Sequence, residues 1–171
     1  SAAAVAVLRD WENPADTRAA ALLPAEAENE LLKNNLPFAL VSTRQLHRLR
    51  SFRAIVIPEV VRLSADALTA LREYAEGGGG LVLLGACGVR DDEGGGRIGN
   101  AWSSLLGTEP AAGAVRKTVG AGRVAVQPLS PAAEGAVARF LDAAEFLAAL
   151  RFALGDAGPP WELAAEKGPL V

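Results

Sequence analysis

The chain has 171 residues, half of them apolar, and a net charge of −3. This length and apolar content predict one compact domain with a buried core. The scattered positive residues give no basic surface for nucleic acid, and the apolar runs are too short to span a membrane. One cysteine and one histidine exclude an internal disulfide and a zinc site built from several such residues. We therefore expect no metal, no cofactor, no nucleic-acid partner and no membrane partner.

The two ends of the chain predict a segment of a longer polypeptide. The first residues, S-A-A-A-V-A-V-L, lack an initiator Met and a basic leader, and the last residues end without a charged tail. We expect one α/β domain over residues 1–157. Residues 158–171 are then an extension that leads to a downstream domain.

Strand and helix patterns alternate along the first third of the chain. The unbroken apolar run Ala4–Leu8 predicts a central strand that is buried on both faces. Residues 15–35 predict a helix in two pieces, because Pro24 lacks the amide that a helix interior needs. Phe38–Val41 and Arg53–Ile57 predict the second and third strands.

The strongest pattern in the chain is a helix between two strands. Ser64 suits the N-cap, Asp66 suits the first turn, and the apolar residues that follow recur at helical spacing. Gly77–Gly80 ends this helix, and Leu81–Leu84 predicts the fourth strand. That strand runs into a sharp turn that carries Cys87.

The second half of the chain has a weaker signal. A short helix is expected around 101–106, after a Gly-rich acidic loop, and Val115–Val119 with Arg123–Val126 predicts a hairpin or two short edge strands. Ala143–Leu154 predicts a final helix that Gly155 caps. The alternation predicts a three-layer α/β/α sandwich with a mainly parallel central sheet.

Three segments resemble one domain of a known enzyme family. They are D-W-E-N after the first strand, the I-V-I-P strand with the helix and strand that follow, and D-D-E-G-G-G-R followed by L-L-G. In this order they resemble the middle domain of family 42 β-galactosidases and related glycoside hydrolases, often called the trimerisation domain. That domain is a class I glutamine amidotransferase-like, flavodoxin-type sandwich. The later run V-G-A-G-R-V-A-V is similar too, so the resemblance covers residues 5–126.

This resemblance implies a non-catalytic role. Such domains sit beside a catalytic barrel, help to assemble the oligomer and line the mouth of a neighbour's active site. The implied partners are the parent barrel domain and neighbouring subunits of a homo-oligomer. A bacterial protein is implied, with the cytoplasm as the expected compartment, although no signal in the sequence fixes it. The barrel's catalytic carboxylates are not carried over, because this sequence contains no barrel.

Cys87 is the candidate nucleophile. Its turn, G-A-C-G-V, is similar to the G-x-C-x-G elbow of glutamine amidotransferases, but Val89 stands in place of the last glycine. A thiolate needs a base within reach, and His47 is expected at the opposite end of the sheet. We therefore favour a small buried cysteine. Two alternatives stay open: an amidotransferase-type cysteine hydrolase, and a thiol site with Glu12 beside Cys87 that resembles the DJ-1/PfpI superfamily.

Polar and aromatic residues near the carboxyl edge of the sheet are candidates for contacts with a carbohydrate or a subunit. They are Asp10, Trp11, Glu12, Asn13, Glu59, Arg90 and Asp91. Carboxylates and amides bind hydroxyl groups and an indole stacks on a sugar, so a carbohydrate-binding or sensor module is a further alternative. We favour a simpler interpretation, in which Asp10 and Asn13 shape a turn and the acidic run 91–93 is solvated. Trp102 suits either the core or an interface.

Overall fold

The structure is a computed structural model, and it describes residues 3–15, 17–90, 102, 106, 113–130 and 139–155. The strands are β1 (Val5–Arg9), β2 (Phe38–Ser42), β3 (Ala54–Pro58), β4 (Gly80–Leu84), β5 (Val115–Val119) and β6 (Gly122–Gln127). The helices are α1 (Arg18–Lys33), the 3₁₀ helix η1 (Leu46–Ser51), α2 (Ala65–Glu76) and α4 (Ala143–Leu154). The six strands form one sheet in the order β2-β1-β3-β4-β6-β5. Neighbouring strands run parallel except for the antiparallel pair β5 and β6.

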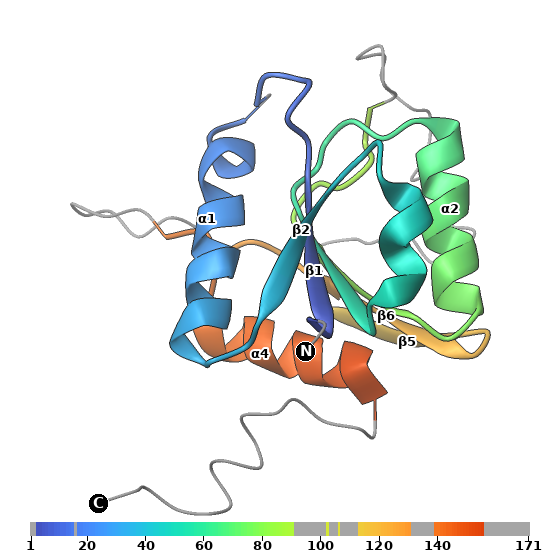
Figure 1. Cartoon of the computed structure of the whole chain (residues 1–171). Helices are drawn as coiled ribbons and strands as arrows, with labels where there is room; N and C mark the ends of the chain where they lie inside the picture. The colour runs from blue at the N-terminus through green and yellow to red at the C-terminus, as the bar shows by residue number, and fades with distance from the viewer. Residues whose placement is uncertain are drawn as a thin grey trace, which may run out of the picture.

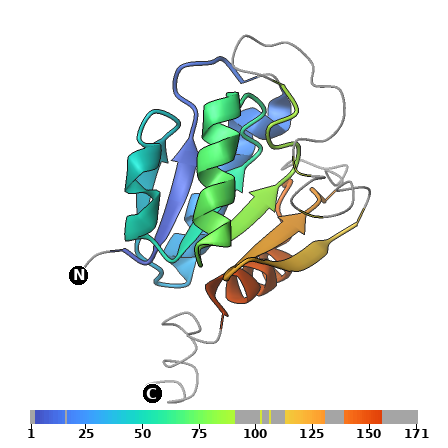
Figure 2. The ribbon, with the colours of Figure 1, turned by 90° about the vertical axis from the view of Figure 1, so that its right-hand side faces the viewer.

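Helices cover both faces of this sheet. Figure 1 views the sheet from its β2 edge, with α1 and α4 on one side and η1 and α2 on the other. Figure 2 shows α2 in front of the strands, with β5 at the far edge. Two apolar clusters fill the space between the layers, one under α2 and η1 and the other under α1 and α4. The predicted α/β/α sandwich is therefore confirmed. Within the described ranges, no helix combines the length and apolar character needed to cross a membrane.

The prediction that the first helix is in two pieces is wrong. Helix α1 runs unbroken through Pro24, and its N-cap Thr17 accepts a hydrogen bond from the amide of Ala20. A proline inside a helix removes one backbone hydrogen bond, but it does not by itself unwind the neighbouring turns. Leu23 and Leu31 of α1 are fully buried against the sheet. Tertiary packing therefore holds the two halves in one helix.

The caps predicted for the other two long helices are confirmed. Ser64 Oγ accepts the amide hydrogen of Ala67 at the start of α2. Helix α4 has the predicted bounds, and it ends at Gly155, whose φ of +69° suits glycine. Asp142 caps its start by accepting from the amide of Glu145 at 2.9 Å.

The late hairpin is confirmed as an antiparallel pair, but only one of its strands lies at the edge. Strand β6 also pairs in parallel with β4, so it is an inner strand, and β5 forms the edge. The burial of β6 agrees with this position, since five of its six residues are buried.

Several expectations fall outside the described residues. They concern the acidic loop with Asp91, most of the short helix around 101–106, and the boundary between residues 1–157 and 158–171. Trp102 and Leu106 are described, and both are buried.

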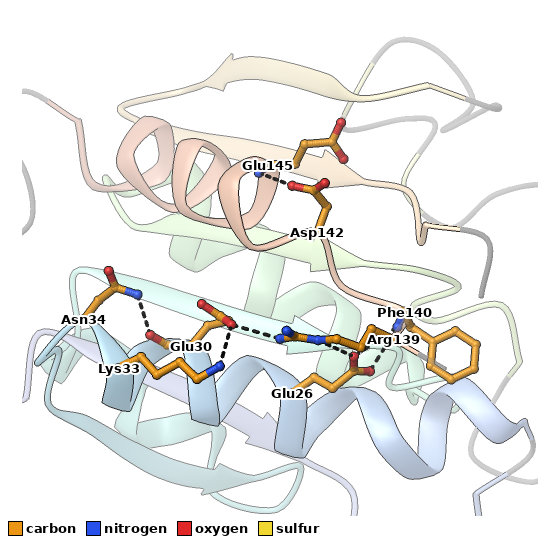
Figure 3. A network of polar contacts seen from close by, with 8 residues as sticks. All are labelled: Glu26, Glu30, Lys33, Asn34, Arg139, Phe140, Asp142 and Glu145. Atoms are coloured by element: carbon orange, nitrogen blue, oxygen red, sulfur yellow. Dashed lines mark hydrogen bonds and ion pairs between the residues drawn. The ribbon is translucent and has the colours of Figure 1, made fainter. Parts of the chain in front are cut away.

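Acidic residues of α1 fix the segment that leads into α4, as Figure 3 shows. Glu26 accepts a hydrogen bond from the amide of Phe140 at 3.0 Å. Arg139 reaches Glu30 at 3.0 Å, and the buried Glu30 carboxylate also lies 3.5 Å from Lys33 Nζ. These contacts join elements more than 100 residues apart in sequence and set α4 beside α1 on the same face of the sheet.

Candidate functional site

The turn after β4 holds the cysteine, but not in the strained conformation of a nucleophile elbow. The left-handed residues of the turn are Gly85 (φ +72°) and Gly88 (φ +64°), on either side of Cys87. The Cys87 thiol donates to the carbonyl of Ile57 at 3.1 Å and lies 3.4 Å from the carbonyl of Leu84. The glycines therefore make the bend, and the thiol points back onto the strand ends instead of out to solvent.

The electrostatic environment keeps this thiol neutral. The pKa of Cys87 is raised to about 12, chiefly because the thiol is buried; the nearby charge of Glu59 contributes to this rise, and backbone hydrogen bonds from residues such as Val60 oppose it. The thiolate is the reactive form of cysteine, so a raised pKa opposes nucleophilic chemistry at neutral pH. Cys87 is 4% exposed, which also closes it to a substrate.

Trp102 covers the same turn. Its indole Nε1 donates to the carbonyl oxygen of Cys87 at 2.9 Å, and the side chain is 3% exposed. Trp102 and Cys87 belong to one apolar cluster. Of the two positions that the sequence left open for Trp102, the structure places it in the core. No local pattern predicts this contact, because Trp102 follows Cys87 by 15 positions along a Gly-rich stretch of the sequence.

Neither proposed partner of the thiol is among its hydrogen-bond acceptors. His47 is exposed on η1, which leads into the start of β3 at the amino edge of the sheet. Glu12 lies on the carboxyl edge, where it forms an ion pair with Arg44. The thiol itself bonds to backbone carbonyls. The structure thus brings together no Cys–His pair and no Cys–Glu12 pair within the described part of the chain.

Glu59 is the acidic residue that meets the cysteine turn. Its Oε1 accepts the amide hydrogen of Ala86 at 3.1 Å, and its Oε2 accepts the hydroxyl hydrogen of Thr17 at 2.7 Å. The residue is buried and has a φ of +44°, a conformation that is strained for any residue other than glycine. Its carboxylate therefore joins the N-cap of α1 to the turn after β4. The sequence suggested Glu59 only as a general contact, since nothing local reveals partners 27 and 42 residues away.

The residues after β1 form a closed turn. Asp10 Oδ1 accepts the amide hydrogens of Glu12 and Asn13 at 3.1 and 3.2 Å, and Oδ2 accepts from Asn13 Nδ2 at 2.9 Å. Both carboxylate oxygens of Asp10 thus accept hydrogen bonds that shape the turn. Trp11, which is 59% exposed, remains open to solvent, so a stacking contact between Trp11 and a sugar stays a prediction.

Arg90 is placed by its backbone. Its amide donates to the carbonyl of Val61 at 3.0 Å, and its carbonyl accepts from the amide of Leu63 at 3.1 Å. These bonds and a short bridge to Arg62 fix the chain after the cysteine turn beside the segment that follows β3. Asp91 lies outside the described residues.

A small cavity lies between the ends of β1 and β3. It is lined by residues 8–10, 13–15, 20, 24 and 58–62, and its volume is about 70 Å³. This volume suits about two water molecules and is well below the roughly 150 Å³ of a cavity that holds a benzene ring. It is therefore too small to enclose a sugar ring. Among the residues described, no three His, Cys, Asp or Glu side chains come together in a way that could hold a metal ion.

The buried thiol leads to a prediction about alkylation. Because the pKa of Cys87 is raised to about 12, we expect iodoacetamide to react slowly with the folded chain, and the rate should rise about tenfold per pH unit from about pH 6 to 9 without levelling off. Reaction in denaturing urea should be complete and should show an ordinary thiol pKa near 8.5. Mass spectrometry over a pH series measures both rates. A folded-state pKa below about 7 would contradict this assignment and restore the thiol-site alternative.

Comparison with known proteins gives similarity at the level of fold. No protein-family model matches the sequence, and no curated protein matches it. Among solved structures, the β-galactosidase from Bacillus circulans sp. alkalophilus is similar over 92% of this chain, with a TM-score of 0.69 and 14% identity. Gan42B, a GH42 β-galactosidase from G. stearothermophilus, is similar over 84% of this chain, with a TM-score of 0.65 and 15% identity. The β-galactosidase from Bifidobacterium adolescentis is similar over 64%, with a TM-score of 0.56 and 22% identity.

These similarities cover only part of the larger enzymes. The chain spans 28% of the Gan42B chain, 31% of the B. circulans chain and 55% of the B. adolescentis chain. At these identities the comparisons show a shared fold. The chain is thus similar to one part of GH42 β-galactosidases.

Proposed function

We propose that this chain is a non-catalytic, amidotransferase-like domain of a glycoside hydrolase related to β-galactosidases, and that it acts through contacts with a catalytic barrel domain and with neighbouring subunits. The observation that carries the proposal is the burial of the Cys87 thiol. Cys87 stands where an amidotransferase-like fold would hold its nucleophile, yet it is buried, donates to a backbone carbonyl, and has its pKa raised to about 12. The fold similarity to part of GH42 β-galactosidases supports the proposal that the chain belongs to a larger glycoside hydrolase.

The same observation argues against the cysteine-enzyme alternatives. A cysteine hydrolase and a DJ-1/PfpI-like site both require an accessible thiolate. The structure holds Glu12 in an ion pair with Arg44, and the acidic group near Cys87 is the carboxylate of Glu59. A negative charge beside a thiol opposes its ionisation. The site therefore favours a structural cysteine.

An activity measurement tests the non-catalytic part of the proposal. We expect no glutamine hydrolysis and no cleavage of a nitrophenyl β-galactoside by the purified chain, and no difference between the chain and Cys87→Ala. The assay should detect a rate several orders of magnitude below the typical enzyme value of about 10 s⁻¹. Glutamine hydrolysis that disappears in Cys87→Ala would refute the proposal and establish a cysteine hydrolase.

The proposed parentage has a separate test. Sequencing the genomic reading frame that encodes residues 1–171 should reveal a catalytic barrel in the same frame. A frame that contains only this domain would contradict the role as an accessory domain of a hydrolase, whatever the activity assay shows.

A further inference from the structure

The connections of the sheet diverge at the ends of β1 and β3. Strand β1 leads into α1 on one face and then to β2, whereas β3 leads into α2 on the other face and then to β4 (Figure 1). The two strands are parallel neighbours, so the chain leaves their carboxyl ends in opposite directions. Open α/β sheets bind their ligands in the crevice at such a point. The cavity of about 70 Å³ described above lies there, since residues 8–10 and 58–62 line it.

One polar group in the wall of this cavity has no partner. Arg9, the last residue of β1, lines the cavity, and its Nη2 lies 2.6 Å from the carboxylate of Glu28. Its Nε is buried and has no hydrogen-bond acceptor among the residues that the structure describes. A buried donor without an acceptor is costly, so such a group in a native protein calls for water or a ligand. The Nε–H group of Arg9 is therefore the donor that the cavity offers to a guest.

A helix carbonyl supplies the matching acceptor. Ala20 and Pro24 of α1 both line the cavity. Pro24 has no amide hydrogen, so the carbonyl of Ala20 lacks the hydrogen bond that a residue four positions later normally donates in a helix. The wall thus combines a donor at Arg9 with an acceptor at Ala20. A hydroxyl group both donates and accepts hydrogen bonds, so it suits the two together.

The volume of the cavity limits the size of the guest. A space that suits about two water molecules also suits a hydroxymethyl group, which has one carbon and one oxygen. A sugar ring that carries this group must then stay outside the cavity. Trp11 lies on the adjacent turn, between the lining residues Asp10 and Asn13, and is 59% exposed. Its indole offers a flat apolar face to such a ring.

We propose that this chain binds a hexopyranose sugar, with the exocyclic hydroxymethyl group in the cavity between β1 and β3 and the ring against Trp11. We call the cavity with Arg9, Trp11 and Ala20 the β1–β3 subsite. The hydroxymethyl oxygen accepts from Arg9 Nε–H, and its hydrogen is donated to the carbonyl of Ala20. The subsite rests on residues of this chain alone, whereas the choice of a galactoside as the probe below rests on the proposed function.

The turn that carries Trp11 is already held in place. Asp10 accepts three hydrogen bonds within the turn, and Glu12 forms an ion pair with Arg44 after β2. A sugar therefore meets a shaped surface, and little ordering of the chain opposes its binding.

A larger groove at the amino edge of the sheet is the competing location. Its volume is about 540 Å³, which falls in the range of small-molecule sites, and it is lined by residues 50, 52, 53, 73, 74 and 77–79. The hydroxyl of Tyr74 donates there to the carbonyl of Phe52, and Arg53 donates to the carbonyl of Leu154. Among the described residues, no buried side-chain donor of this groove lacks a partner. The β1–β3 subsite is therefore the better match for a hydroxyl group.

An NMR titration of the ¹⁵N-labelled chain with methyl β-D-galactopyranoside tests the proposal. This sugar has roughly 13 non-hydrogen atoms and remains largely outside the cavity, so we expect a dissociation constant on the order of 1 mM. A titration to about 100 mM covers this value. The Arg9 Nε–H resonance and the amide resonances of residues 9–13 and 58–62 should shift and saturate together.

A matched sugar isolates the hydroxymethyl contact. Methyl β-D-fucopyranoside is the 6-deoxy form of the same sugar and differs only in lacking that hydroxyl group. It fills the cavity with a methyl group and leaves the donor of Arg9 and the acceptor of Ala20 without partners. We expect it to bind at least about tenfold more weakly, because a site built for a hydroxyl group discriminates against an analogue without one. The Arg9 Nε–H resonance should not respond to it.

Two variants assign the contacts to residues. Trp11→Ala removes the indole face and should weaken the binding of the galactoside at least about tenfold. Arg9→Lys keeps a positive charge opposite Glu28 but removes the Nε–H group, so it should bind both sugars with the same weak affinity, as a double-mutant cycle measures. The matched control is Arg72→Lys, at an arginine that pairs with Glu76 on α2, and it should bind as the parent chain does. Circular dichroism establishes that each variant is folded.

The outcomes separate the subsite from the proposed function. Failure to saturate by about 100 mM overturns the subsite, and so do equal affinities of the parent chain for the two sugars. Shifts confined to the amino-edge groove, or galactoside binding that Trp11→Ala leaves unchanged, overturn it as well. The non-catalytic accessory role stands in each of these cases, because it needs no sugar on this chain. Glutamine hydrolysis by the chain would remove the proposed function and leave the sugar titration unaffected.

Discussion

Trp102→Ala is expected to lower the free energy of unfolding by about 3–5 kcal/mol, because it empties a large core position. Trp102 is buried in the cluster that contains Cys87 and donates its indole hydrogen to the carbonyl of Cys87. The vacated space should also admit water and reagent to the thiol. We therefore expect iodoacetamide to alkylate Cys87 faster in this variant than in the parent chain. Urea denaturation and mass spectrometry measure the two effects.

Two variants serve as controls for this result. Trp102→Phe keeps most of the packing and loses the hydrogen bond, so its cost should be near 1–2 kcal/mol and the thiol should stay protected. Trp11→Ala removes a tryptophan that is 59% exposed, and its effect should lie within about 0.5 kcal/mol. If Trp102→Ala were as mild as Trp11→Ala, the assignment of Trp102 to the core would be wrong.

Gly80→Ala is expected to be similarly damaging, for a steric reason. Gly80 is the first residue of β4, and a Cβ atom there would lie 2.1 Å from the carbonyl oxygen of Ala153 in the last turn of α4. The carbonyl belongs to the backbone, and the backbone also fixes the position of a Cβ atom, so neither can rotate away. We expect a loss of about 3 kcal/mol or more, at the upper end of overpacking costs. For a domain of this size the thermal midpoint should fall by roughly 10 °C.

The matched control is Gly113→Ala, because a Cβ atom at Gly113 would meet nothing within 4 Å. Its thermal midpoint should stay near that of the parent chain. Thermal unfolding followed by circular dichroism compares the two variants directly. A normal midpoint for Gly80→Ala would mean that α4 does not pack closely on β4, and the arrangement of that face would need revision.

The cysteine turn illustrates how this fold accommodates a thiol without using it. An active elbow needs the nucleophile itself in a strained, exposed conformation, with a base beside it. Here Gly85 and Gly88 take the left-handed conformations, while Glu59, the residue after β3, bears backbone strain with a φ of +44°. The Glu59 carboxylate uses its oxygens to hold Thr17 and Ala86 in place. The polar groups at this edge thus join α1 to the strands and leave the sulfur facing backbone carbonyls.

The sequence by itself determined the elements whose signals are local. The start of α2 was predicted because Ser64 bonds to an amide three residues away, and the end of α4 because Gly155 accepts a positive φ. Strands β1 to β4 followed from short, mainly apolar runs, and β5 with β6 followed from a hairpin pattern. The order of strands and helices then limited the fold to a sandwich with a largely parallel sheet. The same local logic failed at Pro24, because the burial of α1 against the sheet outweighed one missing hydrogen bond.

The tertiary structure alone decided what the cysteine turn is. From the sequence, Cys87 could be a nucleophile or a buried thiol, since both follow a strand at the carboxyl edge of a sheet. The contacts that decide between these two roles come from distant parts of the chain. The thiol donates to the carbonyl of Ile57, the indole of Trp102 bonds to the carbonyl of Cys87, and the charge of Glu59 raises the pKa of the thiol. The position of β2 at the edge of the sheet has the same character, because a strand becomes an edge only when the order of the sheet is fixed. The burial of the Cys87 thiol and the edge position of β2 both depend on the assembled sheet, so neither can be read from the spacing of residues along the sequence.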